Sequence, residues 1–574
     1  MSQKIVIDPI TRIEGHLRVD VVVDDNNVVT DAYTSSTLWR GLETIMKGRD
    51  PRDAGFFMQR ICGVCTYSHY KAGIMAVENT LGITPPLNAV LTRSLMSCAL
   101  IMHDHAVHFY QLHALDFVDI VSALSADPKA ASEEAFKYTD NPYACGADHL
   151  KTVQERVQKF VDKGNLGPFA NAYYGHKTYK FTPEQNLIAL SHYLENLRVQ
   201  RTAAQMMAIF GGKQPHPQSL TVGGVTSVMD ILSPSRLGEY LTKFKEVADF
   251  INRAYYPDVV MAGRAYANEP SVLNDVGTAN LWTHEECPLS ANEWLFESGL
   301  ILNGDLSKVL ELDEDKITEE ATHAWYKNDK ALHPYDGEQE PNYTGFKVEK
   351  TLNAQGEMVD TKVLDTKGKY SWIKAPRYDG EPLQVGPLAN IVVNYAKGNK
   401  YVVPVVDKFL KDTGLPLSAV LSTLGRTACR MLEAKIVADN GLTAFNNMVE
   451  NIKSGDTETC AKYKIDKKKE YKGRYIGNVP RGALSHWCRI KNGVIENWQA
   501  VVPSTWNASP KDKDGKMGPY EASIIGVKID DLTQPLEVIR KIHSFDPCIA
   551  CAVHVMDTKG NELGSYKVDP NICC

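Results

Sequence analysis

Apolar and polar residues alternate near the start of the chain, a pattern that is typical of a half-buried β-strand. The apolar positions that fall on one face of this segment are Leu17, Val19, Val21 and Val23. The turn-forming run Asp24-Asp25-Asn26-Asn27 then leads into a second extended segment. The sequence therefore predicts a pair of N-terminal strands.

Farther along, apolar residues recur every three or four positions, which is typical of amphipathic helices. One such pattern covers about residues 87–123. A second begins after the N-cap residue Thr182 and stops at Gly211-Gly212. A third begins after Ser233-Pro234, and Pro257 marks its expected end. Three long helices of this kind can bury their apolar faces against one another, so a mostly helical bundle is expected.

The C-terminal half has a different pattern. Residues 300–390 are rich in Gly, Pro, Asp and Lys, which indicates a long irregular segment with short strands. Between two extended runs, Lys491-Asn492-Gly493-Val494 predicts a two-residue type I′ hairpin. Paired residues in such a hairpin keep a constant sum of sequence numbers, which brings Arg481 close to Ser504 at the open end.

Composition excludes several classes of protein. The 574 residues could fill three or four average domains, and 43% hydrophobic with 23% charged residues is typical of a globular protein rather than a fibrous or disordered one. The net charge of −7 makes nucleic acid an unexpected partner. The sequence has no apolar run of about 18 to 20 residues and no secretory signal in the first eleven residues, so we expect the chain to fold in the cytoplasm.

Two Cys-x-x-Cys pairs stand near opposite ends of the chain: Cys62 with Cys65, and Cys548 with Cys551. Either pair alone fits a redox disulfide or half a zinc site, but together they can supply four thiolates to one centre. Asp546-Pro547-Cys548 has the residue order of a helix N-terminus, where a thiolate is favoured. Soft sulfur selects zinc, copper(I), nickel or iron clusters, and the residues alone leave that choice open.

A purely structural zinc site would need no acid, base or guanidinium beside its cysteines. Ionisable residues within short motifs of this chain therefore argue against such a site. Such groups are Glu14, Asp104 and Arg481. His69 and His554 each follow a cysteine pair by about one helical turn, so each is expected to support the cysteines rather than bind the metal.

The other histidines and cysteines carry weaker signals. Four histidines lie on different faces of the first predicted helix and are expected to be structural rather than a second metal or haem site; they are His103, His105, His108 and His113. Isolated cysteines are expected to be buried apolar residues; they are Cys98, Cys145, Cys287, Cys429, Cys460 and Cys488.

Several long motifs, in the same order from end to end, make the chain resemble the large, catalytic subunit of nickel-iron hydrogenases of the membrane-bound uptake type. The resemblance implies an α+β, mostly helical fold, with a long-helix core and peripheral N-terminal and C-terminal β-hairpins, as one catalytic unit over residues 1–554. The motifs are Asp8 to His16, Arg60 to Cys65, His103 to Asp116, Gly211 to His216, Pro480-Arg481-Gly482, Val502 to Asn507 and Asp546 to His554.

The resemblance implies that Cys62 and Cys548 bind nickel terminally, while Cys65 and Cys551 bridge nickel to an iron that carries cyanide and carbon monoxide. It also implies a magnesium or other divalent ion near the mature C-terminus. The matching positions are the Glu43 carboxylate, the Ala500 backbone carbonyl and His554.

By the same resemblance, dihydrogen is split heterolytically and a base takes the proton. That base is a terminal thiolate such as Cys548, with Glu14 next in the relay, or else the guanidine of Arg481. Arginine is a poor base, so the thiolate is favoured and Arg481 is expected to act electrostatically. Asp104 and Asp546 would orient Arg481.

Two further residues belong to the implied surroundings of the iron. Ser504, together with Arg481, would hydrogen-bond the cyanides, and Pro480 would lie beside them. The same resemblance therefore agrees with the proximity of Arg481 and Ser504 that the hairpin predicts.

The resemblance further implies an iron-sulfur small subunit as partner, because this chain has no spare cysteine clusters to conduct electrons. The partner's signal would carry the folded pair to the periplasmic face of the membrane, where a cytochrome b passes electrons to quinone in hydrogen-uptake respiration. Residues 555–574 match a propeptide that a maturation protease removes after nickel-insertion chaperones have acted. Hydrogen-sensing relatives commonly lack such a tail, which favours an energy-converting enzyme over a sensor. The alternatives are a hydrogen-sensing regulatory protein and a zinc-stapled structural scaffold.

Overall fold

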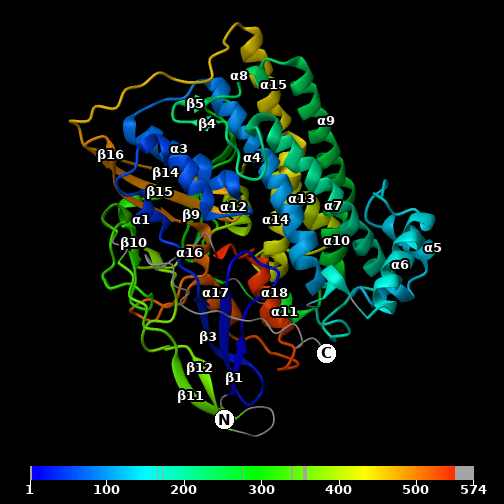
Figure 1. Ribbon diagram of the computed structural model, residues 1–574. Coiled ribbons are helices and arrows are strands. Elements are labelled where there is room, and N and C mark those ends of the chain that lie inside the picture. The colour runs from blue at the N-terminus through cyan, green and yellow to red at the C-terminus, as the bar shows by residue number, and fades with distance from the viewer. Residues whose placement is uncertain are drawn as a thin grey trace.

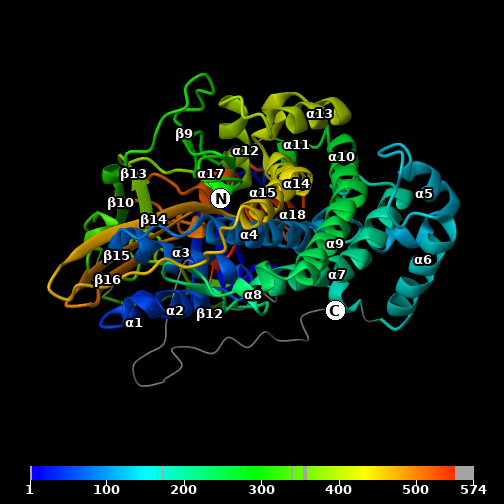
Figure 2. The same cartoon turned by 90° about the horizontal axis from the view of Figure 1, so that it is seen from above.

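A computed structural model describes residues 3–549, with gaps at 165, 171, 274, 276, 338–339 and 353–357. The expectations for Cys551, His554 and residues 555–574 lie outside the described residues. Long helices gather on one side of the molecule and a twisted sheet lies on the other (Figures 1 and 2). The predicted α+β, mostly helical architecture is confirmed.

The predicted bundle is formed by α4 (Leu87–Val107), α7 (Pro183–Gly211) and α9 (Pro234–Phe250), joined by α14 (Thr423–Asn440). Helix α4 packs against α7 and α14, and α7 packs against α9. Both ends of α7 are as predicted. The Thr182 hydroxyl accepts the Gln185 N–H at 3.2 Å, and Gly212 ends the helix with a φ of 78°.

Two predicted helix ends are wrong. The first helix was expected to reach about Ala123, but α4 ends at Val107 and continues as a π-helix, His108–His113, and a 3-10 turn. The third was expected to end at Pro257. Instead α9 passes through a π-helical turn into α10 (Tyr256–Ala265), and Pro257 stands in the first turn of α10. Proline is tolerated there because it follows the π-helical turn directly, where the regular α-helical hydrogen-bond pattern is already interrupted.

The N-terminal strand pair is confirmed and gains a third member. The sheet consists of β1 (Gln3–Ile7), β2 (Leu17–Val23) and β3 (Val29–Ser36), in antiparallel order. The alternating apolar residues of β2 are buried against a cluster that includes α17 (Pro519–Ile524) and α18 (Leu536–Ser544). The sheet thereby packs against α18, the helix that leads to Cys548.

The C-terminal hairpin forms as predicted between β15 (Gly482–Lys491) and β16 (Val494–Val501), with Lys491 opposite Val494. A bulge shifts the register by one residue from Arg489 onward. The hairpin is not peripheral, however. A strand that the sequence pattern did not predict, β14 (Tyr471–Val479), pairs with β15, and helix α3 (Thr66–Leu81) packs on both strands.

The region 300–390 contains short paired strands, as expected. They are β10 (Ile317–Glu320) with β13 (Ala375–Tyr378) and β11 (Lys347–Leu352) with β12 (Met358–Val363). The other short strands are β4 (Leu220–Thr221), β5 (Gly224–Val225), β6 (Leu281–Thr283), β7 (Glu286–Pro288), β8 (Trp294–Phe296) and β9 (Gly299–Ile301).

Shorter helices complete the fold, and α5 and α6 lie at its edge beside α7 in both views (Figures 1 and 2). In the described part of the chain, no helix has the length and apolar character needed to cross a bilayer. The remaining helices are α1 (Leu42–Met46), α2 (Ala54–Met58), α5 (Pro128–Ala135), α6 (Ala147–Asp162), α8 (Val228–Ile231), α11 (Pro270–Leu273), α12 (Pro387–Ala396), α13 (Val403–Thr413), α15 (Leu442–Lys453) and α16 (Pro503–Asn507).

Candidate metal centre

Three of the four predicted metal-binding cysteines meet in the core. The sulfurs of Cys62, Cys65 and Cys548 lie within 4.8 Å of one another, and each residue is at most 4% exposed. The Sγ atoms of Cys62 and Cys548 are 3.2 Å apart, so they are not joined by a disulfide bond. The backbone N–H groups of Val64 and Cys65 both point at the Cys62 sulfur, at 3.2 and 3.1 Å. Amides so placed favour a thiolate, and buried soft donors suit nickel, iron or zinc.

Cys548 is fixed by two segments that are distant in sequence. Glu14 forms a short parallel bridge with it: the Glu14 N–H donates to the Pro547 carbonyl at 3.2 Å, and the Ile549 N–H donates to the Glu14 carbonyl at 2.8 Å. This bridge places Glu14 Oε2 at 3.4 Å from the Cys548 sulfur. The Cys548 N–H donates to Ser504 Oγ at 3.2 Å. A carboxyl group therefore stands within reach of a thiol proton.

Arg481 stands in the buried two-residue turn, Pro480-Arg481, that joins β14 to β15. Its Nη1 donates to Asp104 Oδ2 at 3.2 Å and its Nη2 to Asp546 Oδ1 at 3.1 Å, as predicted. Gly482 follows with a φ of 122°, and a Cβ there would lie 2.4 Å from a backbone nitrogen of Gly386, so the turn requires glycine.

The charge of Arg481 follows from its neighbours. Burial by itself lowers the pKa of the guanidinium, but Asp546, Cys548 and Asp104 outweigh burial and hold the pKa well above its usual value. Arg481 and Ser504 lie just beyond the paired part of the hairpin, and both adjoin the Asp546 to Cys548 segment. A permanently charged guanidinium can stabilise negative charge but is not a base.

His69 lies one turn after Cys65 in α3, as expected, but its hydrogen-bond partner is another histidine. Its Nδ1 is 3.2 Å from Nε2 of His486 on β15. Burial lowers the pKa of His69 to about 4, so the ring is neutral near pH 7. Sequence reasoning missed His486, because only the pairing of strands far from Cys65 brings it to α3.

Glu43 lies in the first turn of α1, beside β16. Its Oε1 accepts the Ala500 N–H at 2.7 Å, so the two predicted positions are adjacent. Loss of hydration raises the pKa of Glu43 to about 7, although Lys374 opposes the shift. A divalent cation beside this carboxylate would favour its charged form.

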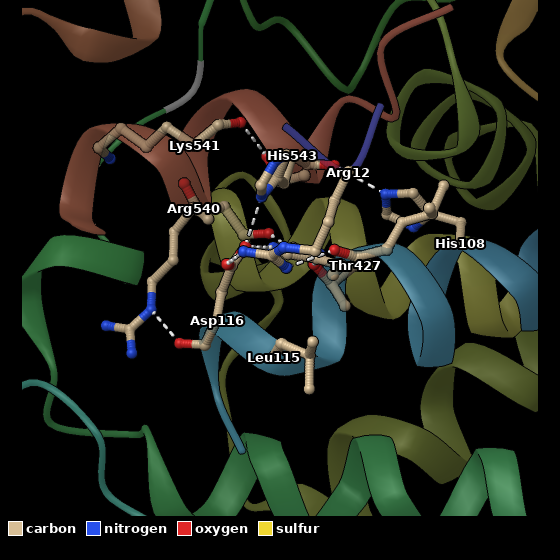
Figure 3. Close-up of polar contacts among 12 residues, drawn as sticks. Arg12, His108, Leu115, Asp116, Thr427, Arg540, Lys541 and His543 are labelled. Carbon is tan, nitrogen blue, oxygen red and sulfur yellow. Dashed lines mark hydrogen bonds and ion pairs between the residues drawn. The ribbon is translucent and has the colours of Figure 1, made fainter. Parts of the chain in front are cut away.

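A second polar cluster, which sequence reasoning did not assemble, fixes the segment before Glu14 (Figure 3). The half-buried Arg12 forms an ion pair with the buried Asp116. The other Asp116 oxygen lies 2.6 Å from Nδ1 of His543, whose Nε2 donates to the Thr11 carbonyl at 2.8 Å. Arg540 donates to the Asp116 carbonyl at 2.7 Å. The Thr11-Arg12 and His103 to Asp116 motifs held the signal for this cluster, but only the tertiary structure joins them.

The histidines expected to be structural have protein partners. His105 Nε2 is 2.6 Å from Glu433, His108 Nε2 donates to the His543 carbonyl at 2.7 Å, and His103 Nδ1 is 2.9 Å from Asp104. The cysteines expected to be buried are so, with one exception: Cys460 is exposed, because it follows α15 in a surface segment.

Comparisons with known proteins agree with this geometry. A sequence profile described as nickel-dependent hydrogenase matches residues 40–554, and one described as HoxL-like matches residues 4–35. A quinone-reactive Ni/Fe-hydrogenase large chain of Wolinella succinogenes is 69% identical over 99% of both chains. An uptake hydrogenase large subunit of Rhizobium leguminosarum bv. viciae is 45% identical over 99% of this chain and 98% of that one.

Solved structures lead to the same family. The reduced Ni-Fe-Se hydrogenase of Desulfovibrio vulgaris Hildenborough has a TM-score of 0.77 and 32% identity, over 96% of this chain and 100% of that one. The expected resemblance is thereby confirmed. With its cysteine cluster and its match over nearly the whole length, this chain belongs to the nickel-dependent hydrogenase family, as a large chain of the enzyme.

Proposed function

We propose that this chain is the hydrogen-cleaving subunit of an uptake hydrogenase, which oxidises dihydrogen and passes electrons to an iron-sulfur small subunit. The observation that carries the proposal is the contact between the buried cysteine cluster and the Glu14 carboxyl, 3.4 Å from the Cys548 sulfur. A structural zinc site would need neither that acid nor a buried guanidinium such as Arg481. A proton-handling centre needs both a base and a fixed positive charge.

Cys62, Cys65 and Cys548 would hold the metals, with Cys551 as the fourth ligand by its place in the second Cys-x-x-Cys pair. These cysteines are buried, their sulfurs are soft ligands, and a backbone N–H points at the Cys62 sulfur, so the site suits nickel and iron. When bound, a nickel-iron centre with cyanide and carbon monoxide on its iron supplies the Lewis acid that polarises dihydrogen.

The protein's own groups then move and balance charge. The Cys548 thiolate takes the proton and hands it to Glu14 Oε2, which lies 3.4 Å from the sulfur. Arg481 stays cationic between Asp104 and Asp546 and offsets the negative charge of the thiolates. Ser504 and Pro480 shape the side of the site on which the small iron ligands would lie.

We also propose a magnesium-type cation beside Glu43, with the Ala500 carbonyl and His554 as further ligands. The support is the position of the half-buried Glu43 carboxylate, which accepts the Ala500 N–H at 2.7 Å, while loss of hydration raises its pKa to about 7 although Lys374 opposes the shift. A hard cation with oxygen ligands fits that need.

The assembly follows from the relatives. The Wolinella succinogenes relative is quinone-reactive, so we propose quinone as the final acceptor through a membrane cytochrome b, at the periplasmic face. Nickel-insertion chaperones and a protease acting after His554 would complete maturation, so residues 1–554 form the working unit and 555–574 the propeptide.

Metal analysis tests the proposal. The complex is purified from its native host after growth on dihydrogen, and nickel, iron and zinc are measured together with the turnover rate. We expect on the order of one nickel per chain, lost in Cys62→Ser and kept in Cys429→Ser, whose sulfur is buried outside the cluster. Zinc without nickel would support a scaffold instead, and nickel with negligible turnover would support a hydrogen sensor.

A further inference from the structure

A cysteine, a histidine and an aspartate form a second chemical cluster at the edge where α6 meets the bundle. The Cys145 sulfur, in the loop before α6, lies 3.3 Å from Nε2 of His192 on α7. The other ring nitrogen of His192 lies 2.9 and 2.8 Å from the two carboxylate oxygens of Asp258 on α10. Tyr110 donates its hydroxyl to Asp258 at 2.7 Å. Nucleophile, base and orienting carboxylate thus follow one another as in enzymes that activate a thiol.

The surroundings of His192 make it a cation. Nδ1 faces a carboxylate and Nε2 also lies 2.6 Å from the Tyr143 carbonyl, so both nitrogens meet groups that can only accept. Burial by itself lowers the pKa of His192, but Asp258 and Cys145 outweigh burial and hold the pKa well above its usual value. An imidazolium 3.3 Å from a sulfur can give its Nε2 proton to the group that leaves when the sulfur attacks.

The loop that carries Cys145 is held in one strained conformation. Ala144 has a φ of 48°, which a residue with a Cβ rarely adopts. The Ala144 carbonyl accepts from Ser191 Oγ at 2.9 Å, and the Tyr143 N–H donates to the Arg253 carbonyl at 3.2 Å. Cys145 is 5% exposed, so the residue lies just beneath the surface.

From this cluster we propose that Cys145 is a peroxide-reactive cysteine, whose sulfur hydrogen peroxide converts to a sulfenic acid. The sulfur attacks one peroxide oxygen, an S–O bond forms and the O–O bond breaks. The leaving hydroxide takes the Nε2 proton of His192 and departs as water. The attacked oxygen stays on the sulfur with its hydrogen as Cys–S–OH, so sulfur loses two electrons and the peroxide gains them. The proton of the thiol, or one from solvent, then restores the imidazolium.

The test compares two cysteines of the same folded chain. The purified complex is treated with hydrogen peroxide for increasing times, the peroxide is removed, and the protein is then unfolded in the presence of dimedone, so that labelling reports the sulfenic acid formed in the folded chain. Labelled peptides are quantified by mass spectrometry. Exposure alone predicts that Cys460, the exposed cysteine, is labelled first and Cys145 hardly at all. Activation of the sulfur by the imidazolium of His192 predicts the reverse order, with Cys145 labelled at least ~10-fold faster than Cys460.

A variant of His192 tests whether the reactivity of Cys145 depends on the positive charge of the imidazolium or only on the conformation of the loop. His192→Gln keeps a donor for the Tyr143 carbonyl but removes the positive charge, and we expect labelling of Cys145 to fall at least ~10-fold. Cys429, which is fully buried, serves as the unreactive control. Labelling of Cys145 no faster than Cys460 in the unaltered protein, or an unchanged rate in folded His192→Gln, would overturn the proposal. If that variant does not fold, the order in the unaltered protein decides alone.

Discussion

Glu14 and Cys548 stand 534 positions apart in the chain, and their side chains meet at 3.4 Å. The contact depends on backbone pairing, because Glu14 bonds on both sides to the residues that flank Cys548. A bridge of this kind fixes both side chains on one side of the paired strands. The proton route proposed for this enzyme is therefore set by the register of two short segments.

Replacing Glu14 by glutamine tests that route. Glu14→Gln keeps the shape of the side chain but removes the carboxylate, so we expect nickel content to remain and proton exchange with dihydrogen to fall ~10²- to 10⁴-fold. The measurement is deuterium exchange between gas and water, with nickel determined on the same sample. Glu521→Gln, a buried glutamate bonded to Thr34 rather than to the cysteines, is the control. Full exchange activity in Glu14→Gln would remove Glu14 from the relay.

The guanidinium of Arg481 contacts two aspartates at once, which leads to a second prediction. Lysine keeps the positive charge but cannot bridge Asp104 and Asp546 as a guanidinium does. We expect Arg481→Lys to retain nickel and to lose ~10²- to 10³-fold in kcat, with little change in KM. Arg198→Lys, at the surface, should behave as the unaltered enzyme. An Arg481→Lys enzyme with normal kcat would show that charge alone suffices.

Asp116 is the centre of the cluster in Figure 3. Its removal should lower the stability of the fold and loosen the segment that precedes Glu14. Burial by itself raises the pKa of Asp116, but Arg12 and His543 outweigh burial and hold it well below its usual value. Its ion pairs therefore stabilise the fold above about pH 4, and that stabilisation is lost as the pH falls through the lowered pKa.

We expect Asp116→Asn to cost about 3 to 5 kcal/mol of unfolding free energy at neutral pH, because it leaves the buried His543 and the half-buried Arg12 without their carboxylate partner. Thermal unfolding of the purified complex measures the loss. Asp439→Asn removes a surface pair with Lys435 and should cost less than about 1 kcal/mol. Equal effects of the two changes would contradict a supporting role for Asp116.

For Glu521 we expect stability to change with pH in the opposite direction, falling as the pH rises. Burial raises its pKa from 4.5 to about 8, although it accepts the Thr34 N–H at 2.9 Å. Between those two pH values the folded chain holds one more proton than the unfolded chain, so this residue lowers the unfolding free energy by about 1.4 kcal/mol per pH unit as pH rises.

Glu521→Gln does not titrate, so its unfolding midpoint should fall less than that of the unaltered protein between pH 5 and pH 8. Apparent midpoints of thermal unfolding at several pH values provide the comparison. Glu133→Gln, at an exposed position of α5, is the matched control and should leave the slope unchanged. Parallel curves for Glu521→Gln and the unaltered protein would contradict the assignment.

The sequence by itself determined the local elements and the chemical groups. Capping residues and periodic apolar positions set the ends of α7, and Asn492-Gly493 set the β15 to β16 hairpin, because these preferences depend on neighbouring residues. The paired Cys-x-x-Cys motifs and the motif residues Glu14 and Arg481 likewise identified the candidate centre.

The tertiary structure decided the rest, because long-range contacts can override local preference. The π-helical turns that continue α4 and α9 depend on packing rather than on their apolar pattern. Strand β14, His486 beside His69 and the ion pair of Arg12 with Asp116 all require segments distant in sequence to meet. Motifs in the sequence can identify candidate residues. Only the folded chain sets the distances between them and, through burial, their charge states.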